Sequence, residues 1–443
     1  MNPNTDNIYS DYEKIVPSEK LPQFLFDHFR SLKEVPWIKD VEEEASCQAL
    51  QTSVQKYNKY RLPVNFLDRI FLKLYVKKNK KDPSGGSGQD KKNILFLSSR
   101  YSDIILETKK HHHVGLLVQG KLDRLFAAKN FIGYVNVNDL DQYVLAYLKE
   151  KNIKYLYWLI EEVENKLIAA NPDYIVLCND ILPIESAVVL VSKKLGIATI
   201  EIQHGMYTES VMPTTTRSVV DHLLVWGEHF KDLYVRANIR KPEDVYILGY
   251  PSSIEKQYAL QKKKNYTVCY LGENFSTFNK SSLKIELEFV DALSKICKKK
   301  ALKFIYRPHP MDNRKLLEEK LPDIQFTSKK EKLKETFEKA DIFISFISTA
   351  LPEAAMRSKI SLQLTNYPID IYVPNYENLG VCNKTLKTFD ELENYLAEII
   401  NASDLNKFKL NFNNDYVETR YNPGQRFLEL IKEIEEKNFN KNK

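Results

Sequence analysis

The feature that most constrains the fold is a repeated alternation of short apolar strands with helices, which starts near Asn93. Runs such as "NILFLSS" and "PDYIVLCND" are almost continuously apolar, and helical segments lie between them. One of these segments is "SAVVLVSKKLG", a helix that Gly196 is expected to close. Strands that are apolar on both faces are typical of a parallel sheet covered by helices on each side. The alternation therefore predicts an α/β fold.

The same pattern restarts at "NYTVCYLGE", after the lysine-rich "QKKKN", and 443 residues exceed what one ordinary core needs. We expect two doubly wound Rossmann-like domains that face a central cleft, because ligands of such sheets bind at the carboxyl ends of the strands. The expected division is a helical extension and linker at 1–90, a first domain at 91–255, a second at 256–415 and a C-terminal helix at 416–443. One long helix is predicted at 140–171, and a short strand at "DIQFTS".

The segment before the first domain carries apolar residues at helical spacing. Within it, "NFLDRIFLKLYVKK" interleaves basic and apolar residues, so it either packs on the main body or lies on a membrane surface. The following "KKDPSGGSGQDKKN" has the composition of a linker, and its "GGSG" resembles an engineered splice. No function follows from the linker.

Bulk composition excludes several classes of protein. The formal charge is only +6, which does not indicate a nucleic-acid binder. Five scattered cysteines without a C-x-x-C pair predict reduced thiols in a cytoplasmic protein. No apolar run approaches the ~18 residues that span a bilayer, and the polar N-terminus is not a signal peptide. We expect a cytoplasmic protein, with attachment to the inner face of the membrane left open.

Polar residues follow three apolar runs of the second domain, at "GEN", "RPHP" and "SFIST". Two prolines stiffen the backbone around the histidine of "RPHP", so its imidazole can hold a phosphate oxygen, although capping of a carbonyl is the alternative. The hydroxyls and N–H groups of "SFIST" could bind an anion, or they could simply cap the helix that follows. Glu353, in the first turn of that helix, could accept ribose hydroxyls. The predicted donor-binding residues are Arg307, His309, Ser345, Ser348, Thr349, Glu353, Gly272 and Glu273.

In the first domain, the strand "IATIEI" ends at Gln203, His204 and Gly205. Glycine allows a sharp turn or the close approach of a ligand, and the histidine could contact phosphate or act as a base. The candidates for a general base are Asp180, Glu185, His204 and Glu209, and the sequence does not choose among them. Asp180 and Glu185 could instead be a turn residue and a helix cap.

The adjacent His111, His112 and His113 do not predict a metal site. Neighbouring residues converge poorly on one ion, and no acidic or thiol partner stands at ligand spacing. No G-x-G-x-x-G or Walker loop is present either, so the motifs give no support to a dinucleotide or P-loop site.

From about Asn93 to Lys432, the order of "QHG", "VWGEHF", "RPHP" and "SFIST" resembles bacterial surface-polysaccharide glycosyltransferases of the GT-B architecture. The similar groups are the capsule sialyltransferases and polysialyltransferases, the capsule Kdo transferases and the teichoic acid polymerases. The resemblance implies that His309-Pro310 and Ser348-Thr349 hold the donor's phosphate and that His204-Gly205 is catalytic. The acidic motif of the sialyltransferases is not evident, and "SFIST" lacks the Asp of the teichoic pattern. CMP-linked donors are favoured, and CDP- or UDP-linked donors stay open.

The leading interpretation is an inverting, metal-independent glycosyltransferase that moves a sugar from a nucleotide-sugar donor to a capsule, lipopolysaccharide or teichoic-type glycan. A GT-B-like nucleotide-sugar epimerase and a non-catalytic scaffold of a glycan assembly complex are the alternatives. An epimerase converts its donor without an acceptor, and a scaffold binds no nucleotide. The sugar, the linkage and the oligomeric state do not follow from the sequence.

Overall fold

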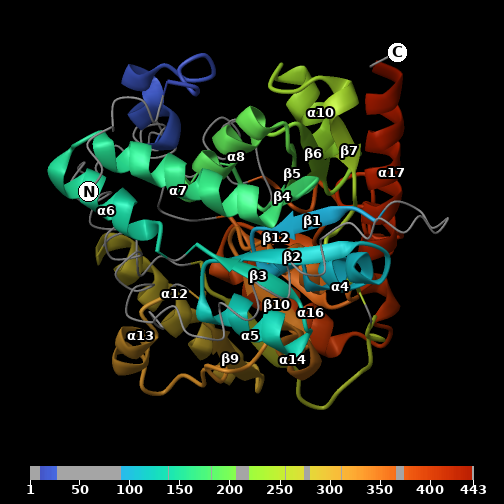
Figure 1. The fold of residues 1–443 in the computed structure, drawn as a ribbon. Helices are drawn as coiled ribbons and strands as arrows, with labels where there is room; N and C mark the ends of the chain where they lie inside the picture. Colours follow the sequence, from blue (N-terminus) through green and yellow to red (C-terminus); the bar gives the residue numbers. More distant parts are fainter. Residues whose placement is uncertain are drawn as a thin grey trace. The chain divides into compact units, whose positions relative to one another are not determined.

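The structure is a computed structural model that describes residues 10–26, 91–137, 139–180, 182–205, 219–254, 256–273, 280–310, 312–365 and 374–441 (Figure 1). It forms two compact units. Unit 1 comprises residues 1–253 and 420–443, and unit 2 comprises residues 254–419. The amphipathic segment "NFLDRIFLKLYVKK", the "GGSG" linker and Glu209 lie outside the described residues.

Unit 1 is built on a parallel seven-stranded sheet in the order β3-β2-β1-β4-β5-β6-β7. Its strands are β1 (Asn93–Phe96), β2 (His113–Val118), β3 (Gly133–Asn136), β4 (Tyr174–Leu177), β5 (Ala198–Ile202), β6 (His222–Val225) and β7 (Val245–Ile247). Its helices are α4 (Ser102–His111), α5 (Lys121–Lys129), α6 (Asp141–Glu150), α7 (Lys154–Ala170), α8 (Pro183–Leu195), α10 (Glu228–Arg236) and α17 (Pro423–Lys441).

Alternate residues of these strands fill two separate cores. Leu95 and Ile175 point to the core under α6, α7 and α8. Phe96 and Val176 point to the opposite core, where Phe427 of α17 packs. The C-terminal helix therefore covers the first sheet beside α4, although it follows unit 2 in the chain (Figure 1).

Residues 10–26 also belong to the first core. Tyr12 is buried there, and its hydroxyl donates a hydrogen bond to Glu164 Oε2 at 2.7 Å. Lys194 Nζ lies 4.5 Å from the centroid of the Tyr12 ring. This part of the N-terminal segment packs on α7 and α8.

Unit 2 contains a parallel five-stranded sheet in the order β12-β11-β10-β8-β9. The strands are β8 (Thr267–Leu271), β9 (Lys303–Arg307), β10 (Ile342–Ser345), β11 (Ile360–Leu364) and β12 (Lys384–Leu386). The helices are α12 (Lys280–Lys299), α13 (Arg314–Lys320), α14 (Leu333–Lys339), α15 (Ala350–Met356) and α16 (Phe389–Asn401). Short 3-10 turns lie in both units. Those of unit 1 are Ser18–Lys20, Ser99–Tyr101 and Pro242–Asp244, and that of unit 2 is Asn406–Phe408.

Both sheets are doubly wound, which confirms the predicted fold class. In unit 1 the chain leaves β1 toward β2 and β3, and then returns to the other side of β1 with β4. In unit 2 it leaves β8 toward β9 and returns with β10. The strand order therefore reverses between β1 and β4 and between β8 and β10. Crevices at such reversal points, at the carboxyl ends of the strands, are where open α/β sheets bind ligands.

Two predicted elements are wrong in detail. The long helix expected at 140–171 is interrupted between α6 and α7, because Lys151 adopts a left-handed conformation with φ 54°. The side chain of Asn152 then accepts a hydrogen bond from Lys154 N at 3.1 Å, which begins the second helix. The strand expected at "DIQFTS" is reduced to one bridge between Tyr306 and Phe326. The predicted closure of α8 by Gly196 is confirmed, with φ 67°.

Candidate functional site

The candidate donor site of unit 2 is a set of loops that follow β8, β9 and β10. The loop after β9, Arg307 to Pro310, is held by direct contacts to the loop after β8. Gly272 N donates to Arg307 O at 2.8 Å, and a Cβ added at Gly272 would lie 3.0 Å from His309 N. A side chain at position 272 would require the histidine turn to shift by a few tenths of an ångström. Glycine therefore favours the close approach of these two protein loops.

Asp312 completes this turn. Its Oδ2 accepts the backbone N–H of His309 at 2.7 Å, and its own N–H donates to His309 O at 2.9 Å. Burial lowers the pKa of His309 below its ordinary value of 6.5, with the Asp312 charge acting in the opposite direction. The imidazole is therefore mainly neutral at pH 7, so it can donate one hydrogen bond and accept another.

The loop after β10 binds a carboxylate of the protein itself. Glu273 Oε1 accepts the backbone N–H groups of Phe346 at 2.8 Å, Ile347 at 3.1 Å and Ser348 at 3.3 Å. The Ser345 hydroxyl also donates to this oxygen. Successive N–H groups of this kind form an anion-binding concavity. In unit 2 the concavity lies where the strand order reverses, and Glu273 fills it.

The protonation of Glu273 is set by its burial. Desolvation raises its pKa from 4.5 to about 7, against the hydrogen bonds from Ser345 and the backbone, which lower it. The carboxyl is thus half-ionised near neutral pH. A donor phosphate would not meet the N–H groups of 346–348, because they are already bound. The hydroxyls of Ser348 and Thr349 remain the groups of this loop that suit a phosphate.

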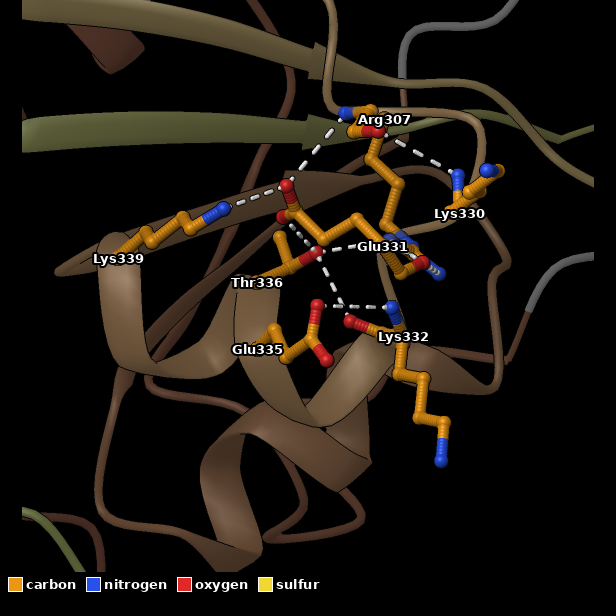
Figure 2. A network of polar contacts seen from close by, with 8 residues as sticks. Arg307, Lys330, Glu331, Lys332, Glu335, Thr336 and Lys339 are labelled. Atoms are coloured by element: carbon orange, nitrogen blue, oxygen red, sulfur yellow. Dashed lines mark hydrogen bonds and ion pairs between the residues drawn. The ribbon is translucent and has the colours of Figure 1, made fainter.

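Arg307 is engaged with protein atoms (Figure 2). Its Nη1 donates to Thr336 Oγ1 at 2.7 Å and to Glu331 O at 3.2 Å, and its Nη2 donates to Glu331 O at 3.3 Å. The Glu331 carboxylate in turn accepts Lys339 Nζ at 2.6 Å and Thr336 Oγ1 at 2.8 Å. The guanidinium expected to bind phosphate therefore ties the end of β9 to the start of α14.

Glu353 forms an ion pair one helical turn along the chain, with 3.1 Å between Oε1 and Arg357 Nη2. The Arg357 guanidinium also lies 4.9 Å from the centroid of the Phe337 ring. The role predicted for Glu353, which is to accept ribose hydroxyls, would therefore fall to a carboxylate that is also paired with Arg357.

Two carboxyls of unit 2, those of Asp312 and Glu286, were not among the predicted site residues. Glu286 of α12 is fully buried and accepts a hydrogen bond from the Tyr306 hydroxyl at 2.7 Å. Burial raises the pKa of Glu286 to about 8, with the nearby charge of Asp312 adding to the effect. A carboxylate two residues after "HP" was visible in the sequence, but nothing marked Glu286, which occupies an ordinary position of an amphipathic helix.

In unit 1, Gln203 holds the end of β5 in place. Its Oε1 accepts Trp226 N at 2.9 Å, and its Nε2 donates to Gly205 O at 2.7 Å. The Trp226 indole N–H donates to Gln203 O at 2.8 Å. Arg100 Nη2 donates to His204 O at 3.0 Å, which fixes the backbone of the predicted catalytic histidine.

The candidate bases beside this turn are buried. Asp180 has no exposed surface, and its Oδ2 accepts Val219 N at 2.9 Å. Glu185 accepts Gln119 Nε2 at 3.0 Å, and burial raises its pKa. Glu201 of β5 is fully buried, and neither carboxyl oxygen has a hydrogen-bond partner among the residues that the structure describes. Burial, followed by the Asp180 charge, raises the pKa of Glu201 well above its ordinary value. A charged residue inside the apolar run "IATIEI" was the sequence signal for Glu201.

The three adjacent histidines have different surroundings. His111 Nε2 lies 3.7 Å from Glu107 Oε1, His112 Nδ1 accepts Lys92 N at 3.3 Å, and His113 begins β2. Over the described ranges, no three His, Cys, Asp or Glu side chains gather in a way that could hold a metal ion. Within the same ranges, no helix is long and apolar enough to cross a membrane.

No family model matches the chain, and no curated protein matches its sequence. A UDP-GlcNAc 2-epimerase from Methanocaldococcus jannaschii, solved with UDP-GlcNAc and UDP, has 16% identity and a TM-score of 0.53, covering 77% of this chain and 99% of that one. A putative UDP-N-acetylglucosamine 2-epimerase from Listeria monocytogenes has 12% identity and a TM-score of 0.56, covering 79% and 98%.

A glycosyltransferase from Rickettsia africae has 13% identity and a TM-score of 0.52, covering 78% of this chain and 99% of that one. Enzymes of both kinds thus share the two-unit architecture over nearly their whole length. Identities this low establish the fold alone. The chain has the GT-B type of fold.

Proposed function

We propose that this protein is a nucleotide-sugar enzyme, and specifically an inverting glycosyltransferase that needs no metal ion. The observation that carries the proposal is the set of loops at the strand reversal of unit 2. His309 follows β9, Ser348 and Thr349 follow β10, and β8 lies between those strands. Strand spacing separates the two outer loops by about 10 Å, a span that nucleotide phosphates can bridge.

In this proposal the leaving phosphate is stabilised mainly by neutral donors. The imidazole of His309 and the hydroxyls of Ser348 and Thr349 donate hydrogen bonds to oxygens on which charge accumulates as the glycosyl–phosphate bond breaks. Arg307 is a positioning residue in this proposal. Its contacts with Glu331 and Thr336 hold the end of β9, from which the histidine turn starts.

Ionised Glu273 would repel a phosphate bound beside it. The carboxyl is close to half-protonated at pH 7, and a bound phosphate favours its neutral form. We therefore propose that donor binding takes up a proton at Glu273.

The base that accepts the acceptor's proton is proposed among Asp180, His204 and Glu209. The proposed acceptor is a growing bacterial surface glycan of the capsule, lipopolysaccharide or teichoic type, at the cytoplasmic face of the membrane. This part of the proposal is supported by the order of "QHG", "RPHP" and "SFIST" along the chain.

A nucleotide-sugar epimerase is the second candidate. It is favoured by the structural similarity to proteins described as UDP-GlcNAc 2-epimerases, and by two buried carboxyls in unit 1, Glu185 and Glu201, whose raised pKa values suit proton donors. Both chemistries begin with the same donor.

An incubation of the protein with CMP-, CDP- and UDP-linked sugars, followed by analysis of all sugar products, separates the candidates. A transferase consumes donor in proportion to added acceptor glycan and releases the nucleotide. An epimerase produces an isomeric sugar without acceptor. No change in any donor, with or without acceptor, would contradict both.

A further inference from the structure

Unit 2 contains a cavity of about 290 Å³ that the proposed donor site does not use. Three of its lining residues, Tyr266, Asp341 and Ile360, stand at or immediately before the first residues of β8, β10 and β11. His309 and Glu273 follow the last residues of parallel strands in the same sheet. A strand of five residues spans about 15 Å. The cavity therefore lies at the amino ends of the strands, whereas the donor site lies at their carboxyl ends.

An aromatic ring with two ammonium groups forms part of this cavity. Lys359 Nζ lies 4.0 Å and Lys256 Nζ lies 4.8 Å from the centroid of the Tyr258 ring. Lys359 is only 8% exposed, and within the described part of the chain it donates one hydrogen bond, to Ala340 O at 2.8 Å. An ammonium has three donors, so further donors of Lys359 remain available to a ligand.

Positive charges outnumber negative ones by one among the residues that line the cavity. Three lysines, Lys256, Lys263 and Lys359, stand against two carboxylates, Glu338 and Asp341. Asp341 is already engaged, because its Oδ1 accepts Lys263 Nζ at 2.5 Å and its Oδ2 accepts Thr267 N at 2.9 Å. A partly buried ammonium beside other ammonium groups gains the most from a bound anion.

We propose that this cavity is a second binding site, for a small molecule or headgroup that carries a phosphate-type oxyanion. Lys359 and Lys256 bind the oxyanion, and Tyr258 forms a wall that orients both lysines. The volume is close to the lower limit for small-molecule sites, ~300 Å³, and exceeds what one phosphate group fills. A free phosphorylated metabolite and an anionic lipid headgroup present the same chemistry.

Binding at this site is coupled to the protonation of Lys359. Burial lowers the pKa of Lys359 to about 8; Asp341 and Glu338 oppose this effect, while Lys263 and Lys256 strengthen it. A bound oxyanion favours the charged lysine, so binding above pH 8 takes up a proton and weakens as the pH rises. The charged or titratable groups of the surrounding elements that act on Lys359 or on the Tyr258 ring are Lys256, Lys263, Lys334, Glu338, Asp341 and Arg357.

The test is a calorimetric titration of the full chain with inorganic phosphate at pH 7.5 and 9.5, where phosphate remains largely a dianion. The titration uses the wild type and the variants Lys256→Ala, Lys359→Met and Lys264→Ala. Lys264 is an exposed lysine of the same segment that does not line the cavity, so it is the matched control. A second series in a His309→Ala background removes any contribution of the donor site.

We expect saturable binding that Lys256→Ala and Lys359→Met each weaken at least tenfold, that Lys264→Ala leaves unchanged, and that is weaker at pH 9.5. Because Lys256 is exposed, its variant tests the site even if Lys359→Met does not fold. Co-sedimentation with phosphatidylglycerol vesicles but not phosphatidylcholine vesicles, lost in Lys256→Ala and kept in Lys264→Ala, would identify a lipid headgroup as the source.

Two results would overturn the proposal. One is the absence of binding to both millimolar phosphate and anionic vesicles. The other is binding that Lys256→Ala and Lys359→Met do not change. Either result would leave the donor-site proposal standing, because His309 and Glu273 lie at the carboxyl ends of the strands, away from the cavity.

Discussion

The carboxylate of Glu273 accepts the backbone N–H of Phe346 at 2.8 Å, across 73 positions of sequence, and thereby joins the loop after β8 to the loop after β10. An acidic side chain of the protein thus occupies the concavity where the sequence predicted a bound phosphate.

Replacing Glu273 by alanine removes the hydrogen-bond partner of the backbone N–H groups of Phe346 and Ile347, while Ser348 N keeps the Ser345 hydroxyl at 3.3 Å. Each unsatisfied donor costs about 1–3 kcal/mol, so we expect a loss of at least ~2 kcal/mol in the free energy of unfolding. Urea denaturation measures it. An unchanged midpoint would contradict the proposed anchoring of this loop.

The pKa of Glu273 makes its contribution depend on pH in a defined direction. Its folded-state pKa of about 7 lies above the ordinary 4.5, so unfolding releases a proton between these values. Its stabilising contribution is complete below pH 4.5 and is lost as the pH rises through about 7. The stability of the wild type relative to Glu273→Gln should therefore fall from pH 5 to pH 8. Glu286 titrates in the same direction in both proteins, and the Glu273 charge that helps to raise its pKa exists only in the wild type, so this coupling acts in the same direction.

Gly272→Ala is expected to disrupt the histidine turn, because the new Cβ would lie 3.0 Å from His309 N and 3.2 Å from Asp312 Oδ2. Overpacking of this kind typically costs about 1–3 kcal/mol. We expect the stabilisation by bound nucleotide to be lost as well. Gly120→Ala is the matched control, since nothing lies within 4 Å of a Cβ at that position. Equal nucleotide binding by both variants would argue against the close approach.

His309 should titrate below 6.5 in the folded protein, because burial lowers its pKa. The unfolded chain then binds the proton first on acidification, so this histidine reduces stability as the pH falls below 6.5. Ring resonances in a pH titration by NMR, assigned with His309→Asn, measure the value directly. A pKa above 7 would mean an imidazolium at neutral pH, and the neutral-donor account of phosphate binding would be wrong.

Arg307→Lys separates two roles for the guanidinium. Lysine cannot reproduce the contacts to Glu331 O and Thr336 Oγ1, so we expect a loss of about 1–3 kcal/mol in stability. Lys339→Met in the same network (Figure 2) should cost less than ~1 kcal/mol, because that ion pair is exposed on the lysine side. Full stability of Arg307→Lys with lost nucleotide binding would instead mean that Arg307 contacts the phosphate.

Regular features of the fold could be predicted from the sequence, because buried parallel strands and glycine caps leave local patterns. β5 and the closure of α8 at Gly196 are examples. The break between α6 and α7 could not, because the left-handed Lys151 has no distinctive residue type. β12 and α16 were not among the predicted elements, and β12 is only three residues long.

The sequence predicted individual residues of the candidate site, but it did not predict the contacts that these residues make. The hydroxyls of "SFIST" and the glycine of "GEN" stood out by residue type. Which anion fills the loop after β10 depends on a partner 73 positions away, and which groups bind Arg307 depends on tertiary packing at α14. One sequence does not encode such pairings in a local pattern.

The most direct test of the central claim, that unit 2 carries a nucleotide-sugar donor site, is thermal unfolding with CMP, CDP, UDP and GDP for the wild type and His309→Ala, each with and without Mg²⁺. A nucleotide at about 100 times its Kd adds ~2.7 kcal/mol to stability. The account predicts that one nucleotide family stabilises the wild type without needing Mg²⁺, and that His309→Ala, folded in its absence, shows no such stabilisation. No stabilisation by any nucleotide up to millimolar concentration, or equal stabilisation of both proteins, would contradict it.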